Sequence, residues 1–312
     1  MSVAYLFPGQ GSQQINMLHH LPDHPVVTRT LDEASEVIDE SVFSLDSEAR
    51  LQSSKAVQIC LLIAGVSTAR VLEADGLKPD MVVGHSVGAF GAAVTAGVID
   101  FQEAVSIVKQ RGEWMESIYP TGYGMGVIAG LPQKKIEEIL ENYKTEEEAA
   151  YLANLNAPDQ LTVSGAVSVI RRVLDLCKEA GARKTEMLNV SVPSHCPLLK
   201  NVSEKLSSAL QHIPFHNPTV PYGGNRTARA FRDPEAIKED LVLSISNSVK
   251  WHEATSLFYE LGTRLFIELP PGRVLTDLSC RAFPSARSIS ISENGLNTAR
   301  VLINRDNRQS EL

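Results

Sequence analysis

The distribution of apolar and polar positions along the chain predicts an α/β protein. Short apolar runs at 3–7 and 81–83 each end in a glycine-containing turn, as buried parallel strands do. Apolar residues recur at helical spacing from 54 to 72, and further helices are expected over 88–96 and 101–118. Strands that alternate with helices in this way favour a mostly parallel sheet covered by helices.

The pattern changes at a loop over 119–126 that is rich in glycine and tyrosine. The elements expected next are strand 126–130, helix 133–143, strand 151–156, strand 160–165, helix 168–180 and strand 183–190. This β-α-β-β-α-β order is that of ferredoxin-like folds. The α/β pattern then resumes with a helix after Pro197 and a strand at 265–269.

These patterns together predict two domains. One is a large α/β-hydrolase-like domain with a parallel sheet, made of residues 1–123 and 193–312. The other is a small ferredoxin-like (βαββαβ) domain at 124–192, inserted into the first.

Composition and charge narrow the partner classes. With 312 residues, 43% of them hydrophobic, the chain can bury a large core. A net charge of −8 implies no phosphate-neutralising surface, so no nucleic-acid partner is expected. The four cysteines show neither a C-x-x-C pair nor zinc-ligand spacing, which is typical of reduced thiols. With no signal peptide and no apolar run of roughly 20 residues, a cytoplasmic protein without membrane contact is expected.

The sequence GHSVG at 84–88 matches the pattern G-x-S-x-G between a predicted strand and a predicted helix. In such an elbow the serine occupies a sharp turn, and its hydroxyl points outward at the N-terminus of the helix. The helix dipole favours the negative charge that develops there. An ordinary glycine turn, in which Ser86 only caps the helix, is the other interpretation, but the strand–turn–helix context favours a nucleophile.

A serine nucleophile needs a base, and the chain has eight histidines. His195 follows a strand and the turn at Pro193, at the junction of the two predicted domains, where a cleft is expected. His85 is adjacent to Ser86, but neighbouring side chains on a sharp turn point apart. The other six are expected at the surface or at a helix start: His19, His20, His24, His212, His216 and His252. A solvated loop histidine is the alternative for His195, and no acidic third member of a triad can be identified.

Two further polar residues are candidates for a site. The loop around Gln10 lacks the lysine of a P-loop and is not G-x-G-x-x-G, so it either directs donors at an oxyanion or is a plain turn. Arg111 interrupts an otherwise apolar helix pattern. In a cleft it would need an anion such as a carboxylate, whereas a surface ion pair is the common alternative.

Four motifs carry a resemblance to a known family along nearly the whole chain. FPGQGSQ (7–13), GHSVG (84–88), QRG (110–112) and SVPSHC (191–196), in this order, resemble the malonyl-CoA:acyl-carrier-protein transacylases. The resemblance implies an acyltransferase that forms a malonyl-serine ester and passes the malonyl group to the thiol of a carrier protein. No cofactor or metal is implied.

The resemblance also assigns roles to individual residues. Ser86 is the acylated nucleophile, His195 its base, and Arg111 holds the free carboxylate of the substrate. Gln10 and Val87 form the oxyanion hole. Gln58 corresponds to a buried helix glutamine of the substrate site, and the backbone carbonyl of Ser244 orients the histidine.

Two departures from the family bear on the carrier. The family usually has Gly-Glu where this chain has Gly88-Ala89, and a GPG turn where it has Pro270-Pro271-Gly272. Stretches such as YLANLNAPDQ (151–160) and ELPPGRVLTDL (268–278) look most like the malonyltransferase (epsilon) subunit of malonate decarboxylase. That likeness implies malonyl-CoA as donor, other subunits of that enzyme as neighbours, and a carrier with a phosphoribosyl-dephospho-CoA arm as acceptor. The alternatives are a fatty-acid-synthesis transacylase and a serine hydrolase.

Overall fold

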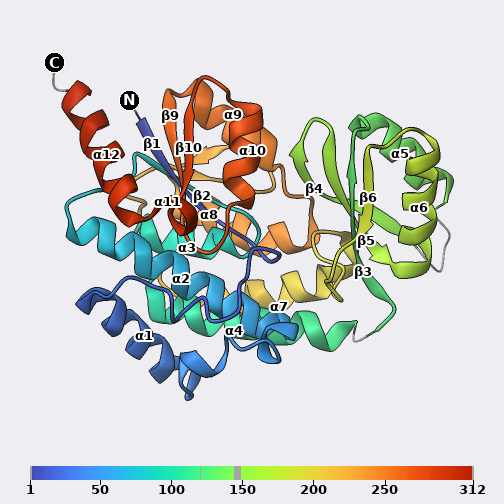
Figure 1. Cartoon of the computed structure of the whole chain (residues 1–312). Helices are drawn as coiled ribbons and strands as arrows, with labels where there is room; N and C mark the ends of the chain where they lie inside the picture. The colour runs from blue at the N-terminus through green and yellow to red at the C-terminus, as the bar shows by residue number, and fades with distance from the viewer. Residues whose placement is uncertain (1, 120, 144–148, 311–312) are drawn as a thin grey trace.

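The computed structural model describes residues 2–119, 121–143 and 149–310, which form two lobes (Figure 1). The described elements from Tyr123 to Met187 form the small lobe, and the other described elements form the large lobe. Each lobe is built around one sheet with helices packed on it. The predicted fold class, an α/β protein with a parallel sheet and a second smaller sheet, is therefore confirmed.

The sheet of the large lobe has the order β10-β9-β1-β2-β7-β8. Its first five strands pair in parallel, and only β8 runs antiparallel to its neighbour. The strands are β1 (Ser2–Phe7), β2 (Met81–Gly84), β7 (Tyr222–Gly223), β8 (Ala230–Phe231), β9 (Thr263–Glu268) and β10 (Arg287–Ser290). Because β1 and β2 pair with Phe7 opposite Gly84, the loops after these two strands emerge side by side at the carboxyl edge of the sheet.

Helices cover both faces of this sheet, so β1 is apolar on both sides (Figure 1). Tyr5 and Phe7 belong to the core beneath α1, α2, α3 and α4, whereas Ala4 and Leu6 face α9 and α10. The helices are α1 (Pro25–Ile38), α2 (Ser54–Ala74), α3 (Gly88–Thr95), α4 (Phe101–Ile118), α7 (Lys200–Leu210), α8 (Pro234–Leu243), α9 (Trp251–Glu260), α10 (Val274–Ala282), α11 (Ile291–Asn294) and α12 (Leu296–Ser310).

Helix α2 confirms the long helix expected over 54–72. Its 21 residues have a mean hydropathy of 1.5 over the most apolar window, so by length and composition this segment is apolar enough to cross a bilayer. In the structure 89% of that window is buried inside the protein, between the sheet and helices α1, α3 and α4. Its apolar character therefore belongs to a helix at the centre of a packed core.

The small lobe has an antiparallel sheet of order β4-β5-β3-β6 with two helices packed against it. Its elements follow the predicted βαββαβ order: β3 (Tyr123–Ala129), α5 (Gln133–Asn142), β4 (Ala150–Ala157), β5 (Gln160–Ala166), α6 (Val167–Glu179) and β6 (Lys184–Met187). Edge strand β4 faces the large lobe, where Leu155 N–H donates to the Val249 carbonyl at 2.8 Å. The exact domain limits stay a prediction, and the outer ends of the large domain, Met1 and Leu312, lie outside the described residues.

No helix was expected directly after His24, but the structure has one there. Helix α1 begins at Pro25, and His24 caps it by accepting a hydrogen bond from Val26 N–H at Nδ1 (3.2 Å). Proline in the first turn and an apolar stripe facing α2 and α4 explain the helix.

Candidate active site

Ser86 lies in a tight turn between β2 and α3, with a φ of 57°. The glycines on either side permit this turn. A Cβ atom at Gly84 would lie 2.0 Å from the backbone carbon of Gly88, and one at Gly88 would lie 2.2 Å from the carbonyl oxygen of Phe7. A non-glycine residue in the left-handed region is strained, so the surrounding structure must hold Ser86 in place.

His195 is the partner of Ser86. Its Nε2 lies 2.7 Å from Ser86 Oγ, and its Nδ1 lies 2.6 Å from the carbonyl oxygen of Ser244. Because a carbonyl can only accept a hydrogen bond, Nδ1 carries the proton and Nε2 accepts from the serine hydroxyl. The backbone N–H of His195 also donates to the Ile245 carbonyl at 2.9 Å. A short 3-10 turn, Ser244–Ser246, thus fixes the histidine where a triad would use a carboxylate.

The environment of His195 keeps the imidazole neutral. The residue is only 2% exposed, and burial lowers its pKa to about 3. The positive charge of Arg111 lowers the pKa further, whereas the bond to the Ser244 carbonyl acts in the opposite direction. At neutral pH the side chain is therefore in the form that can accept the proton of a serine.

Arg111 is buried in the same region, which excludes the surface ion pair considered above. The residue, on α4, is 2% exposed, and its Nη1 donates to Oε1 of Gln58 on α2. Gln58 is itself oriented by Met115, whose Sδ accepts from Nε2 at 3.4 Å. Burial lowers the pKa of Arg111 to about 10, so the guanidinium stays charged at neutral pH. Within the described part of the chain no carboxylate pairs with it, so its charge is available to an anionic ligand.

One cavity of about 50 Å³ brings these side chains together. Six of the seven residues singled out by the sequence line it, while Ser244 lies behind the histidine: Gln10, Gln58, Ser86, Val87, Arg111 and His195. Besides His85, six further residues line the cavity, and sequence reasoning gave none of them a role: Met115, Met125, Asn154, Leu188, Val190 and Ser194. This volume suits a small acyl group of a few heavy atoms.

Gln10 and Val87, which line this cavity, each have a backbone N–H group. The Val87 N–H lies at the N-terminus of α3, and the Gln10 N–H lies in the loop after β1. Among the described residues neither group donates a hydrogen bond, while the Gln10 side chain is engaged with Ser54 Oγ at 3.1 Å. The available donors at Gln10 and Val87 are therefore main-chain N–H groups, as in an oxyanion hole.

His85 points away from Ser86. Its Nε2 lies 3.0 Å from Asn156 Oδ1, and its ring packs against Trp251 with centroids 5.4 Å apart. Burial lowers its pKa. The residue next to the serine thus supports the turn and leaves the role of base to His195.

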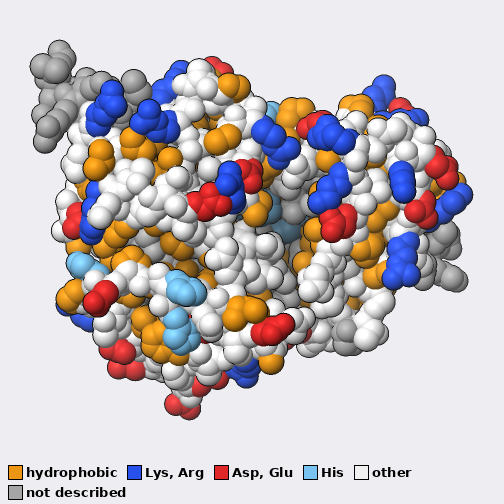
Figure 2. All heavy atoms as spheres, viewed as in Figure 1, with side chains coloured by type: hydrophobic (Ala, Val, Ile, Leu, Met, Phe, Trp, Pro, Cys, Tyr) orange, Lys and Arg blue, Asp and Glu red, His pale blue; other side chains and the backbone are white. Residues whose placement is uncertain are grey.

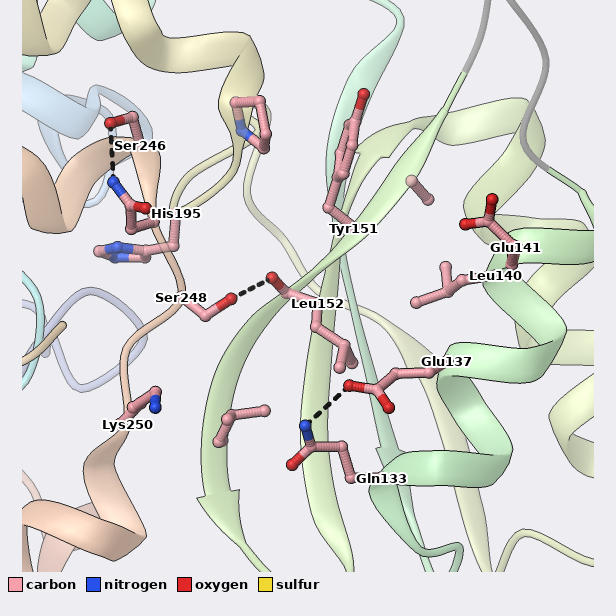
Figure 3. Close-up of a pocket in the computed structure, with 14 residues that line it drawn as sticks. Gln133, Glu137, Leu140, Glu141, Tyr151, Leu152, His195, Ser246, Ser248 and Lys250 are labelled. Carbon is pink, nitrogen blue, oxygen red and sulfur yellow. Dashed lines mark hydrogen bonds between the residues drawn. The ribbon is translucent and has the colours of Figure 1, made fainter. Parts of the chain in front are cut away.

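A larger groove lies beside the segment that carries His195. It has a volume of about 450 Å³ and runs between α5 and β4 of the small lobe and residues 246–250 of the large lobe (Figure 3). Ser248 Oγ bridges the two lobes by donating to the Leu152 carbonyl at 2.7 Å. The space-filling view shows the surface hollowed between the lobes, with charged side chains of both signs around the hollow (Figure 2). Small molecules therefore have access to the junction of the lobes.

Comparisons with known proteins agree along nearly the whole chain. A family model described as acyl transferase domain matches residues 4–303. The malonyl CoA-acyl carrier protein transacylase of Escherichia coli (strain K12) is 36% identical over 296 residues, covering 93% of this chain and 96% of that protein. The enzyme of the same name from Bacillus subtilis (strain 168) is 33% identical over 296 residues, covering 93% of both chains.

Solved structures give the same result. The malonyl CoA-acyl carrier protein transacylase of Coxiella burnetii superposes with a TM-score of 0.92 at 33% identity, covering 97% of this chain and 98% of that one. A malonyl-transacylase in complex with its type II PKS acyl-carrier protein superposes with a TM-score of 0.91 at 36% identity, covering 96% of this chain and 99% of that one. These relatives are named as transacylases, so the closer likeness to a malonate decarboxylase subunit is not shown.

Proposed function

The chain belongs to the acyl transferase domain family, and we propose that it transfers a malonyl group from malonyl-CoA to the thiol of an acyl carrier protein. The observation that carries the proposal is the 2.7 Å contact of Ser86 Oγ with His195 Nε2, in a cavity that also holds the buried cation of Arg111. The names of the relatives support malonyl-CoA as donor and a carrier protein as acceptor.

The first half-reaction acylates the serine. His195 Nε2 takes the proton of Ser86 as Oγ forms a bond to the thioester carbonyl carbon. The N–H groups of Gln10 and Val87 donate to the oxyanion that forms, and each such donor typically lowers the barrier by about 3–4 kcal/mol. The carbon–sulfur bond then breaks, the thiolate takes the proton from Nε2, and a malonyl ester of Ser86 remains.

The second half-reaction reverses these steps with another thiol. The carrier thiol gives its proton to His195 Nε2 and attacks the ester carbonyl, and Ser86 Oγ leaves and recovers the proton. The Ser244 carbonyl accepts from Nδ1–H throughout, which stabilises the imidazolium formed in each step. Ping-pong kinetics follow, with no external acid or base.

Arg111 supplies the selectivity for malonyl. Its planar guanidinium can donate two parallel hydrogen bonds to the free carboxylate of the substrate. An acetyl group would leave this buried cation without an anion, which is unfavourable. The acyl group is therefore selected by charge as well as by size.

For the carrier, we propose the acyl carrier protein of fatty-acid synthesis; the relatives are named malonyl CoA-acyl carrier protein transacylases, which supports an acyl carrier protein as acceptor. Ala89 and the Pro270-Pro271-Gly272 turn support the other carrier, that of malonate decarboxylase. We also propose 124–192 as the limits of the inserted domain, and a cytoplasmic location stays a prediction.

Incubation of the purified chain with malonyl-CoA tests the activity. We expect a stable adduct one malonyl group heavier by intact-mass analysis, absent in Ser86→Ala, and its discharge by a carrier protein. Release of free malonate without a carrier would instead identify a serine hydrolase. Presenting the two purified carriers side by side decides between them, since only the true acceptor should discharge the adduct at a high rate.

A further inference from the structure

The strained turn at Ser86 is held by four hydrogen bonds to the two peptide groups that precede it. In the peptide between Gly84 and His85, the His85 N–H donates to the Phe7 carbonyl at 2.9 Å. In the peptide between His85 and Ser86, the His85 carbonyl accepts from Gly88 N–H at 3.0 Å. The other two atoms of these peptides, Gly84 O and Ser86 N–H, both bond to one side chain, that of Asn225.

The Asn225 carboxamide spans the turn. Its Oδ1 accepts from Ser86 N–H at 3.0 Å, and its Nδ2 donates to the Gly84 carbonyl at 2.8 Å. Only this orientation of the amide satisfies both bonds, because the first needs an acceptor and the second a donor. The angle φ of Ser86 describes rotation about the bond from its N to its Cα, and Asn225 holds the peptide group on the N side of that bond. Asn225 therefore fixes the backbone angle that directs Oγ at His195.

Asn225 is itself held rigidly. It is 2% exposed and lies just after β7, the strand next to β2. Its N–H donates to Asp240 Oδ2 at 2.8 Å, and its carbonyl accepts from Lys250 N–H at 2.7 Å. Asp240, buried on α8, also accepts from Arg226 N–H at 2.9 Å and from the Tyr222 hydroxyl at 3.2 Å.

We propose that Asn225 is a positioning residue for the nucleophile: its carboxamide holds Ser86 in the left-handed conformation in which Oγ meets His195 Nε2. Asn225 does not line the acyl cavity, so it acts through the turn and not on the substrate. The proposal rests on the proposed function, in which Ser86 is acylated. A nucleophile displaced by about 1 Å can lose roughly 100-fold in rate while substrate binding is retained.

The first test is Asn225→Ala, followed by the rate of malonyl-adduct formation and by the KM for malonyl-CoA. We expect kcat for acylation to fall roughly 100-fold with KM changed less than about threefold. Thr30→Ala is the matched control. Thr30 is fully buried on α1 and likewise makes two side-chain hydrogen bonds, to Val26 O and from Arg70, remote from the turn. This control should lower Tm while leaving kcat unchanged.

The second test is Asn225→Asp. This substitution is nearly isosteric, so it keeps the proposal testable even if the alanine variant fails to fold. The new carboxylate still accepts from Ser86 N–H but faces the Gly84 carbonyl without a proton. At pH 8 acylation should be at least about tenfold slower than in the wild type. As the pH falls, the carboxyl takes up a proton, donates to Gly84 O as the amide did, and the rate should recover relative to the wild type.

Two results would overturn the proposal. One is a kcat for Asn225→Ala equal to that of Thr30→Ala, and the other is a pH profile for Asn225→Asp parallel to that of the wild type. A generic fluorophosphonate, which labels activated serines without malonyl recognition, separates this proposal from the function. If the wild type is labelled at Ser86 but gains no malonyl group, the proposed function fails. The relative labelling rates of the variants then still decide the role of Asn225.

Discussion

Replacement of Arg111 by alanine should convert a malonyl-selective enzyme into one that barely distinguishes malonyl from acetyl. Arg111 is buried, charged at neutral pH, and bonded to Gln58 with no carboxylate beside it in the described part of the chain. A substrate carboxylate about 4 Å away, at an effective dielectric constant near 20, gains about 4 kcal/mol of attraction. Desolvation of both charges offsets part of that gain.

Truncating one partner of a buried charge pair typically costs about 2–5 kcal/mol. At about 1.4 kcal/mol per factor of ten, a loss near 3–4 kcal/mol predicts a fall in kcat/KM for malonyl-CoA of roughly 100- to 1,000-fold. Acetyl-CoA gains nothing from the cation, so its kcat/KM should stay the same or rise. Arg111→Lys keeps the charge but not the planar fork, so its kcat/KM for malonyl-CoA should lie between those of the wild type and Arg111→Ala.

The assay is competition between malonyl-CoA and acetyl-CoA for the serine, read by intact mass within one turnover. Arg300→Ala, which breaks a partly exposed ion pair with Asp75 on the surface, is the matched control and should change neither rate. Equal losses for both acyl groups in Arg111→Ala would mean that Arg111 supports the fold of the site and does not bind the carboxylate.

Three further outcomes are expected. First, because burial lowers the pKa of His195 to about 3, the kcat/KM of acylation should stay level from about pH 8 to about pH 5; a decline centred near 6.5 would contradict the neutral buried base. Second, Gln58→Leu leaves the Arg111 fork without its neutral partner and should raise the KM for malonyl-CoA several-fold, measured by steady-state kinetics, whereas an unchanged KM would remove Gln58 from the substrate site. Third, burial raises the pKa of Glu268 to about 7 from an ordinary value near 4.5, so between these values the folded chain holds a proton that the unfolded chain has lost, and this group's contribution to stability falls as pH rises. Urea unfolding should therefore show Glu268→Gln gaining stability relative to the wild type between pH 5 and pH 8, and a constant difference would refute it.

Much of the fold could be predicted because its signals are local. The helix at 101–118 has the predicted bounds, and the βαββαβ order of the small lobe follows from period and turns alone. The two-residue strands β7 and β8 are too short for any periodicity, and they form through pairing with β2 and with each other. Helix α1 was not predicted, because its cap is a histidine, His24, and not one of the Ser, Thr, Asp or Asn residues that usually mark a helix start.

The residues of the site also differ in how well local sequence patterns mark them. Ser86 and His195 stand in local contexts, a glycine elbow and a turn after a strand, that single them out. Gln58, by contrast, is one polar residue in an apolar helix, and only the family resemblance drew attention to it. Asn225 holds the turn at Ser86 and Asn154 lines the cavity, both through contacts with residues distant in sequence, and no local pattern gives either of them a chemical role.

The long apolar helix α2 carries Gln58, one of the two residues that we propose bind the substrate carboxylate. Gln58 is on α2 and Arg111 on α4, and these helices touch only when the core of the large lobe is assembled. In a refolding chain, helical structure can return before α2 has docked, but a carboxylate-selective site cannot. The ratio of malonyl to acetyl labelling, followed in time after dilution from denaturant, therefore reports when α2 and α4 pack together. Circular dichroism reports the recovery of helical structure separately.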